Sequence, residues 1–220
     1  MIRIEKIKKS YGRKQVLADI SLVAEEGSCI GILGSNGSGK STLFNILAGI
    51  IKGEGTFLYN GVNLLTNTNM RSKCLGYVPQ NTPLFEELTA LDNLSLWYSK
   101  AELNYQINNG VLAMLGIPAF IKTPVYKMSG GMKKRLSIGC SVANNPKMLL
   151  LDEPSAALYL VCKERISNYL LDFKRNGGTI LLATHDLQDL ALCDKLYILK
   201  NGILNNYEFD GNVHRLAGSL

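Results

Sequence analysis

The stretch that decides the fold is the glycine-rich run Gly34-Ser35-Asn36-Gly37-Ser38-Gly39-Lys40-Ser41-Thr42. The apolar run before it, residues 28–33, is typical of a buried strand. After it, apolar residues recur at helical spacing, at Leu43, Ile46, Leu47 and Ile50. A glycine-rich turn between a strand and a helix is the context that separates a phosphate-binding loop from a chance match. The glycines let successive backbone N–H groups face one anion, and the helix that begins near Lys40 adds the positive end of its dipole.

Two side chains of this run have the chemistry that a nucleotide site needs. The Lys40 ammonium can reach the β- and γ-phosphates, and the Ser41 hydroxyl can ligate Mg²⁺. A solvated lysine on a glycine-rich surface turn is the alternative, and the strand–loop–helix context disfavours it. We therefore predict that the loop from Gly34 to Thr42 binds a nucleoside triphosphate.

Length and composition place limits on the class of protein. The chain has 220 residues, of which 46% are hydrophobic, enough to bury a core in one or two lobes. No apolar run approaches the roughly 20 residues that span a bilayer, so a role at a membrane needs a partner. The first residues alternate like a strand and lack the apolar core of a signal peptide. The five cysteines have no CxxC spacing, which is typical of core residues in a reducing compartment. We expect a cytoplasmic protein.

The net charge of +6 is compatible with nucleic acid or with an anionic membrane face as a neighbour. The lysines are dispersed, and the small basic groups, such as Lys133-Lys134-Arg135, lack the interleaved aromatic residues of an RNA-binding module. We interpret these groups as solvated faces and expect no nucleic-acid partner.

Short apolar strands alternate with helical segments, which predicts a layered α/β domain. Strands are expected at residues 1–8, 18–24, 28–33, 55–59, 74–79, 147–151, 179–183 and 195–199, with a turn at Gly12-Arg13-Lys14 between the first two. A helix is expected over about 160–174. Between about 86 and 145 the strand pattern stops. There Thr89 can cap a helix that carries Leu91, Leu94 and Trp97, and Ser129 can cap another, which predicts a separate helical lobe.

Two carboxylates end the predicted strand 147–151. Parallel strands place such residues at the carboxyl edge of the sheet, where open α/β sheets bind their ligands. Asp152 can hold Mg²⁺, and Glu153 can orient the attacking water or accept its proton. Acidic residues are also common at ordinary strand ends, so the prediction of a functional role for this pair depends on the phosphate loop in the same chain.

A second helix start, at Ser129-Gly130-Gly131, has the features of an anion site. A serine cap followed by two glycines leaves backbone N–H groups exposed at the helix N-terminus. One chain has no evident need for two such sites. A head-to-tail dimer does, if each nucleotide lies between the loop of one chain and the serine-glycine helix of the other.

Taken in order, these motifs resemble the nucleotide-binding domain of ATP-binding cassette (ABC) transporters over essentially all 220 residues. The resemblance implies an α/β P-loop NTPase core with a mixed sheet, an antiparallel β lobe and a helical subdomain. It implies one ABC domain, with the core over residues 1–85 and 146–220 and the helical subdomain over about 86–145.

The resemblance also implies residue roles. Tyr11 matches the aromatic residue that stacks on adenine, Gln80 matches the glutamine of the Q-loop, and His185 matches the switch histidine that contacts the γ-phosphate. The implied catalytic residues are Lys40, Gln80, Glu153 and His185. The implied Mg²⁺ ligands are Ser41, Gln80 and Asp152. The implied nucleotide contacts are Tyr11, Gly34, Ser35, Asn36, Gly37, Ser38, Gly39, Lys40, Ser41 and Thr42, with Ser129, Gly130 and Gly131 from the opposite chain.

Two positions depart from the family pattern. Met132 stands where the signature usually has glutamine, a variant that resembles the ATPase subunits of bacterial exporters. Tyr159, in Ala156-Ala157-Leu158-Tyr159, stands where the family usually has an aspartate that reaches the opposite loop. A tyrosine cannot supply that carboxylate, so we expect weakened coupling between the two sites with nucleotide binding retained.

The resemblance implies an ATPase that uses ATP and Mg²⁺ and drives transport. Its expected partners are an integral-membrane permease and a second copy of the chain or a paralogous ATPase, at the inner face of the cell membrane. Two alternatives stay open. One is a soluble ABC-family ATPase, and the other is a weakly hydrolysing regulatory subunit, which Tyr159 motivates.

Overall fold

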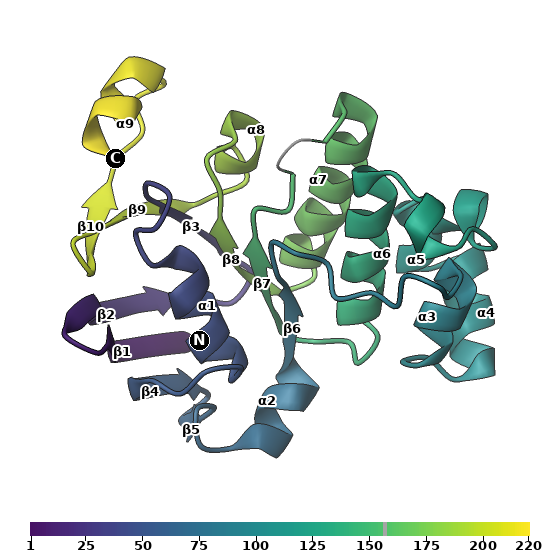
Figure 1. The fold of residues 1–220 in the computed structure, drawn as a ribbon, viewed down its shortest axis with the longest axis horizontal. Coiled ribbons are helices and arrows are strands. Elements are labelled where there is room, and N and C mark those ends of the chain that lie inside the picture. Colours follow the sequence, from purple (N-terminus) through teal and green to yellow (C-terminus); the bar gives the residue numbers. More distant parts are fainter. Residues whose placement is uncertain (156–157) are drawn as a thin grey trace.

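The structure is a computed structural model that describes residues 1–155 and 158–220. Ten strands of the described residues form one sheet in the order β5-β4-β1-β2-β10-β9-β3-β8-β7-β6 (Figure 1). Its antiparallel half consists of β1 (Ile2–Tyr11), β2 (Lys14–Ala24), β4 (Glu54–Tyr59) and β5 (Val62–Asn63). Its other half consists of β3 (Cys29–Leu33), β6 (Leu75–Val78), β7 (Met148–Asp152), β8 (Thr179–Ala183), β9 (Lys195–Lys200) and β10 (Ile203–Tyr207). The pairing of Ile203 with Asp19 joins the two halves.

The parallel strands explain the continuous apolar runs of the sequence. Every residue of β3, β7 and β8 is buried. In a parallel sheet both faces are covered. A strand such as Leu149-Leu150-Leu151 therefore has no solvent-facing positions, and its sequence does not alternate between apolar and polar residues. β6, β7, β8, β3 and β9 run parallel, which brings their carboxyl ends to one edge. The predicted mixed α/β fold is confirmed.

Helix α1 (Lys40–Ala48) lies between the two halves of the sheet (Figure 1). Its side chains Leu43, Phe44 and Leu47 belong to a buried cluster that includes residues of the antiparallel strands together with Met148 and Leu150 of β7. Burying an apolar side chain of this size contributes about 1.5–3 kcal/mol. This packing therefore holds the start of α1 close to the carboxyl ends of β3 and β7.

Helices occupy the chain between β6 and β7: α3 (Ala90–Ser95), α4 (Lys100–Asn108), α5 (Val111–Met114), the 3₁₀ helices η1 (Ile117–Phe120) and η2 (Val125–Lys127), and α6 (Gly130–Ser141). The side chains of Thr89 and Ser129 accept the N–H groups of Asp92 and Met132, as predicted for caps. The prediction that the first of these helices carries Trp97 is wrong. Ser99 caps α4 directly after it, so α3 ends at Ser95.

The remaining helices are α2 (Thr68–Cys74), α7 (Leu160–Arg175), α8 (Leu187–Leu190) and α9 (Val213–Ser219). The turn between β1 and β2 is one residue shorter than predicted, because Lys14 already pairs with Tyr11. Within residues 1–155 and 158–220, no helix has both the length and the apolar character needed to cross a membrane.

Candidate active site

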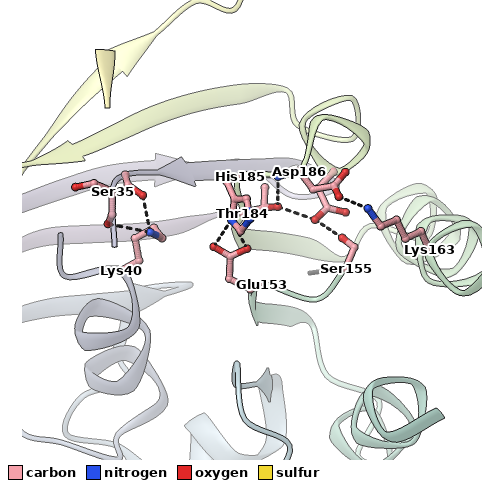
Figure 2. A network of polar contacts seen from close by, with 10 residues as sticks. Ser35, Lys40, Glu153, Ser155, Lys163, Thr184, His185 and Asp186 are labelled. Atoms are coloured by element: carbon pink, nitrogen blue, oxygen red, sulfur yellow. Dashed lines mark hydrogen bonds and ion pairs between the residues drawn. The ribbon is translucent and has the colours of Figure 1, made fainter. Parts of the chain in front are cut away.

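The loop between β3 and α1 curls around the Lys40 ammonium. Lys40 is only 8% exposed, and its Nζ donates to the carbonyl oxygen of Gly34 at 2.6 Å and to that of Ser35 at 3.3 Å (Figure 2). Gly37 and Gly39 adopt φ values of 80° and 111°, a region that favours glycine. The N-cap residue of α1 is Gly39, which has no side chain to cap the helix. The first N–H groups of this helix are therefore available to an anion.

Glycine is required at position 34 for a steric reason. A Cβ built there would lie 2.5 Å from the Ser38 Oγ and 2.8 Å from the carbonyl oxygen of Leu199. The Ser38 Oγ is buried and has no hydrogen-bond partner among the described residues. A buried polar atom without a partner is costly, so this hydroxyl fits a ligand in the loop better than an empty turn.

The two carboxylates lie at the carboxyl end of β7 and are both buried. Asp152 is the last residue of the strand, and its Oδ1 is buried without a hydrogen-bond partner in the described part of the chain. A hard divalent cation such as Mg²⁺ binds through oxygen ligands of this kind. Glu153 has a φ of 53°, held by its N–H bond to the carbonyl oxygen of Ala183 at 2.8 Å. Residues other than glycine with a positive φ have a strained backbone, and such residues are concentrated at functional sites.

His185 lies directly in front of Glu153. Its Nδ1 is 3.0 Å from Oε1 and 2.8 Å from Oε2 of the glutamate (Figure 2). The imidazole is 66% exposed whereas the Glu153 side chain is buried. The histidine therefore covers the outer side of the carboxylate and leaves its own ring open to a ligand.

One cavity of about 370 Å³ collects most of the predicted residues. It is lined by Val16, Asn36, Gly37, Gly39, Lys40, Ser41, Thr42, Gln80, Asp152 and Glu153. The predicted Mg²⁺ ligands Ser41, Gln80 and Asp152 are all in this set. The oxygen donors and the uncapped helix together fit a metal-bound polyphosphate.

Other predicted residues lie outside this cavity. Tyr11 is exposed at the end of β1, with the Lys9 ammonium 5.2 Å from its ring centroid. Ser129 caps α6, and Gly130 has open space around it. Tyr159 precedes α7 and is 86% exposed. Of the run around it, Ala156 and Ala157 lie outside the described residues.

A buried polar network behind His185 was missed by the sequence analysis. The hydroxyls of Ser155 and Thr184 both donate to the Asp189 carboxylate, the second at 2.7 Å (Figure 2). Burial raises the pKa of Asp189, and the two hydroxyl donors oppose that rise. Lys163 of α7 forms an ion pair with Asp186. The available signal was Asp189 itself, which stands one helical turn after His185.

A glycine loop between a strand and a helix, with buried carboxylates at the end of a parallel strand two positions away in the same sheet, defines a P-loop nucleoside-triphosphatase domain. The chain matches the family described as ABC transporter over residues 17–156. It belongs to this family, as the order of the motifs predicted.

Relatives of this chain carry transport functions. The lantibiotic transport ATP-binding protein SrtF of Streptococcus pyogenes is 31% identical over 215 residues, which cover 96% of this chain and 93% of that protein. The methionine import ATP-binding protein MetN of Clostridioides difficile is 36% identical over 214 residues, which cover 92% of this chain and 66% of that protein. The chain is accordingly an ATP-binding subunit of an ABC transporter.

The fold agrees with solved ABC cassettes. A dimeric, post-hydrolysis state of the ATP-binding cassette MJ0796, bound to ADP and Pi, superimposes with a TM-score of 0.84 at 28% identity. The likeness covers 96% of this chain and all of that one. ATP hydrolysis is therefore the activity of this class of domain, and nucleotide is its ligand.

Gly34→Ala is expected to weaken ATP binding tenfold or more, about 1.4 kcal/mol, because the loop must move away from Ser38 and Leu199. Titration with a fluorescent ATP analogue measures this affinity. Gly218→Ala is the control, since a Cβ there meets nothing within 4 Å. Equal affinity of the two variants would contradict the steric argument.

Proposed function

We propose that two chains associate head to tail around two Mg²⁺-ATP molecules and drive a separate integral-membrane permease. The cavity that joins the phosphate loop to Asp152 and Glu153 carries this proposal. In the dimer, Ser129, Gly130 and Gly131 of the second chain complete each site, since the start of α6 lies outside that cavity. The dimeric state of the MJ0796 cassette supports the arrangement.

The residues of one chain divide the work of phosphoryl transfer. The loop N–H groups and Lys40 hold the phosphates and neutralise their charge. Ser41, Gln80 and Asp152 would hold Mg²⁺, which supplies charge neutralisation at the phosphate oxygens. Tyr11, exposed at the edge of the β lobe, stacks on the adenine.

Glu153 acts on the water. Its carboxylate is buried beside the phosphate loop and accepts a proton from the attacking water or orients it. His185 keeps this carboxylate in place through the contacts of its Nδ1, and its exposed ring edge is free to meet the γ-phosphate. Positioning and charge stabilisation supply most of the catalysis in reactions of this type.

For the domain organisation, we propose the boundaries that the sequence predicted. We assign residues 1–85 and 146–220 to the catalytic core with its β lobe, and about 86–145 to a helical subdomain that faces the permease. The chain is placed at the cytoplasmic face of the membrane through that permease, and no nucleic acid takes part.

Export is the favoured direction. Met132 in the signature is the feature that favours it, since this variant resembles the ATPase subunits of exporters. Relatives of both directions exist, such as the Nod factor export ATP-binding protein I and the MetN import protein. In inside-out vesicles that contain the chain and its permease, ATP is expected to drive substrate into the lumen. ATP-driven loss from the lumen would indicate import.

Glu153→Gln is expected to lower the ATPase rate by about 10²–10⁴, because a positioned base contributes that much to the rate. The same variant should still bind ATP and accumulate as a dimer. The rate per mole of purified protein, measured against protein concentration, tests both points. In the unaltered chain this rate should rise with concentration, and hydrolysis by Glu153→Gln at the normal rate would refute the assignment of the base.

Tyr159→Asp is expected to raise the specific ATPase activity, because it restores the carboxylate that the family uses between the two sites. Tyr159 is exposed at the start of α7, so the replacement should leave the fold unchanged. Tyr159→Phe, which keeps the ring, is the matched control. An unchanged or lower rate in Tyr159→Asp would refute the idea that Tyr159 weakens the coupling between the two sites.

A further inference from the structure

Three consecutive basic residues on α6 have three different environments. Lys133 reaches the exposed carboxylate of Glu86, with Nζ–O distances of 2.8 and 2.9 Å. Arg135 donates to the carbonyl oxygen of Leu115 at 2.8 Å. Lys134, between them, is only 6% exposed. The interpretation of this group as a solvated face is therefore wrong for Lys134.

The Lys134 ammonium binds the backbone of the segment that follows β6. Its Nζ donates to the carbonyl oxygen of Pro79 at 3.0 Å and to that of Gln80 at 3.1 Å. The Gln80 side chain lines the cavity that contains Lys40 and Asp152. A single cation of α6 therefore holds the backbone from which this carboxamide projects.

Charge explains why a lysine can be buried here. Desolvation lowers the pKa of Lys134, and the negative charges of Asp152 and Glu153 oppose that shift. Burying a cation is costly unless it is paired and hydrogen-bonded. The two carbonyl oxygens bind the ammonium directly, and the two carboxylates stabilise its charge at longer range.

The opposite end of α6 is hydrogen-bonded to β6 itself. The Ser141 Oγ donates to the carbonyl oxygen of Tyr77 at 2.8 Å. Helix α6 is thus hydrogen-bonded near its start to the segment after β6 and near its end to β6 itself. The contact near its start carries a charge and reaches the Gln80 backbone. The helix start that lies one turn before Lys134 is Ser129-Gly130-Gly131.

We propose that Lys134 is a positioning residue that couples the Gln80 segment of one nucleotide site to the start of α6, which serves the opposite site in the dimer. This inference rests on the head-to-tail dimer of the proposed function. A shift of the Gln80 backbone pulls on an ammonium fixed to α6, so the orientation of the serine-glycine start follows the state of the chain's own cavity. With Tyr159 in place of the family's aspartate, this contact is a route between the sites that the chain retains.

The test compares Lys134→Met with Lys134→Arg. Methionine keeps much of the length of the side chain but removes the donor, whereas arginine can donate to both carbonyl oxygens. Lys134→Met is expected to lower kcat about tenfold, a change of about 1.4 kcal/mol in the barrier, with KM for ATP unchanged. In a Glu153→Gln background it should also weaken ATP-dependent dimer formation, measured by light scattering. Lys134→Arg should restore both properties.

Two control variants separate coupling from general packing. Lys133→Met removes a charge from the same turn, and Ser141→Ala removes the hydrogen bond from α6 to the carbonyl oxygen of Tyr77 in β6. Both are expected to keep kcat and dimer formation close to normal. Each variant is first titrated with ATP at low protein concentration, where the isolated chain binds nucleotide.

Several results would overturn the proposal. Normal kcat and dimerisation in Lys134→Met would do so, as would an equal loss in Ser141→Ala, failure of arginine to restore function, or loss of ATP binding by the isolated Lys134→Met chain. Failure of the proposed function is distinct. In that case the parent Glu153→Gln chain would itself bind ATP without forming a dimer.

Discussion

Negative charge buried at the end of β7 is the constraint on which the rest of the site depends. Asp152 and Glu153 are both removed from water, and buried carboxylates are tolerated only when other groups compensate them. His185 contacts Glu153 from the open side, and Lys134 balances the pair from the helical side. The Oδ1 of Asp152 has no hydrogen-bond partner among the described residues, so it has capacity left to bind a cation. The carboxylates thus organise the groups around them before any ligand binds.

The phosphate loop solves the complementary problem of holding anions without relying on many charged side chains. Its glycines expose N–H groups, and α1 begins without a capping side chain, so the backbone itself supplies the positive field. Lys40 is held by two carbonyl oxygens of the same loop, which keeps its long side chain in one place. Packing of α1 between the two halves of the sheet then fixes this electropositive loop opposite the electronegative end of β7.

The phosphate loop, the two carboxylates and the apolar strands could be predicted from the sequence, because each of them is formed by consecutive residues with a recognisable pattern. Gly34 to Thr42 and Leu149 to Glu153 are examples. The burial of Lys134 could not be predicted from the sequence, because a run of three basic residues has the same pattern whether its side chains face water or bind a buried carbonyl oxygen. The Ser155–Thr184–Asp189 network was missed for a different reason. Ser155 is 34 residues from Asp189 in the sequence, so no local pattern shows that their side chains meet. β5, α2 and α4 are short and polar, so they lack the apolar periodicity that reveals an element.

The position of β3 in the sheet has a consequence for how the protein is made. β3 directly precedes the phosphate loop, and it pairs on one side with β8 and on the other with β9, with Cys29 opposite Ile180 and Ile30 opposite Lys195. Contacts so distant along the chain form late, since the entropy of closing long loops must be overcome first. During synthesis, the phosphate loop therefore leaves the ribosome before both of the strands that flank β3, which are β8 and β9, have been made. The strand that leads into the phosphate loop therefore gains its full set of neighbours only after residue 200, the end of β9, has been synthesised.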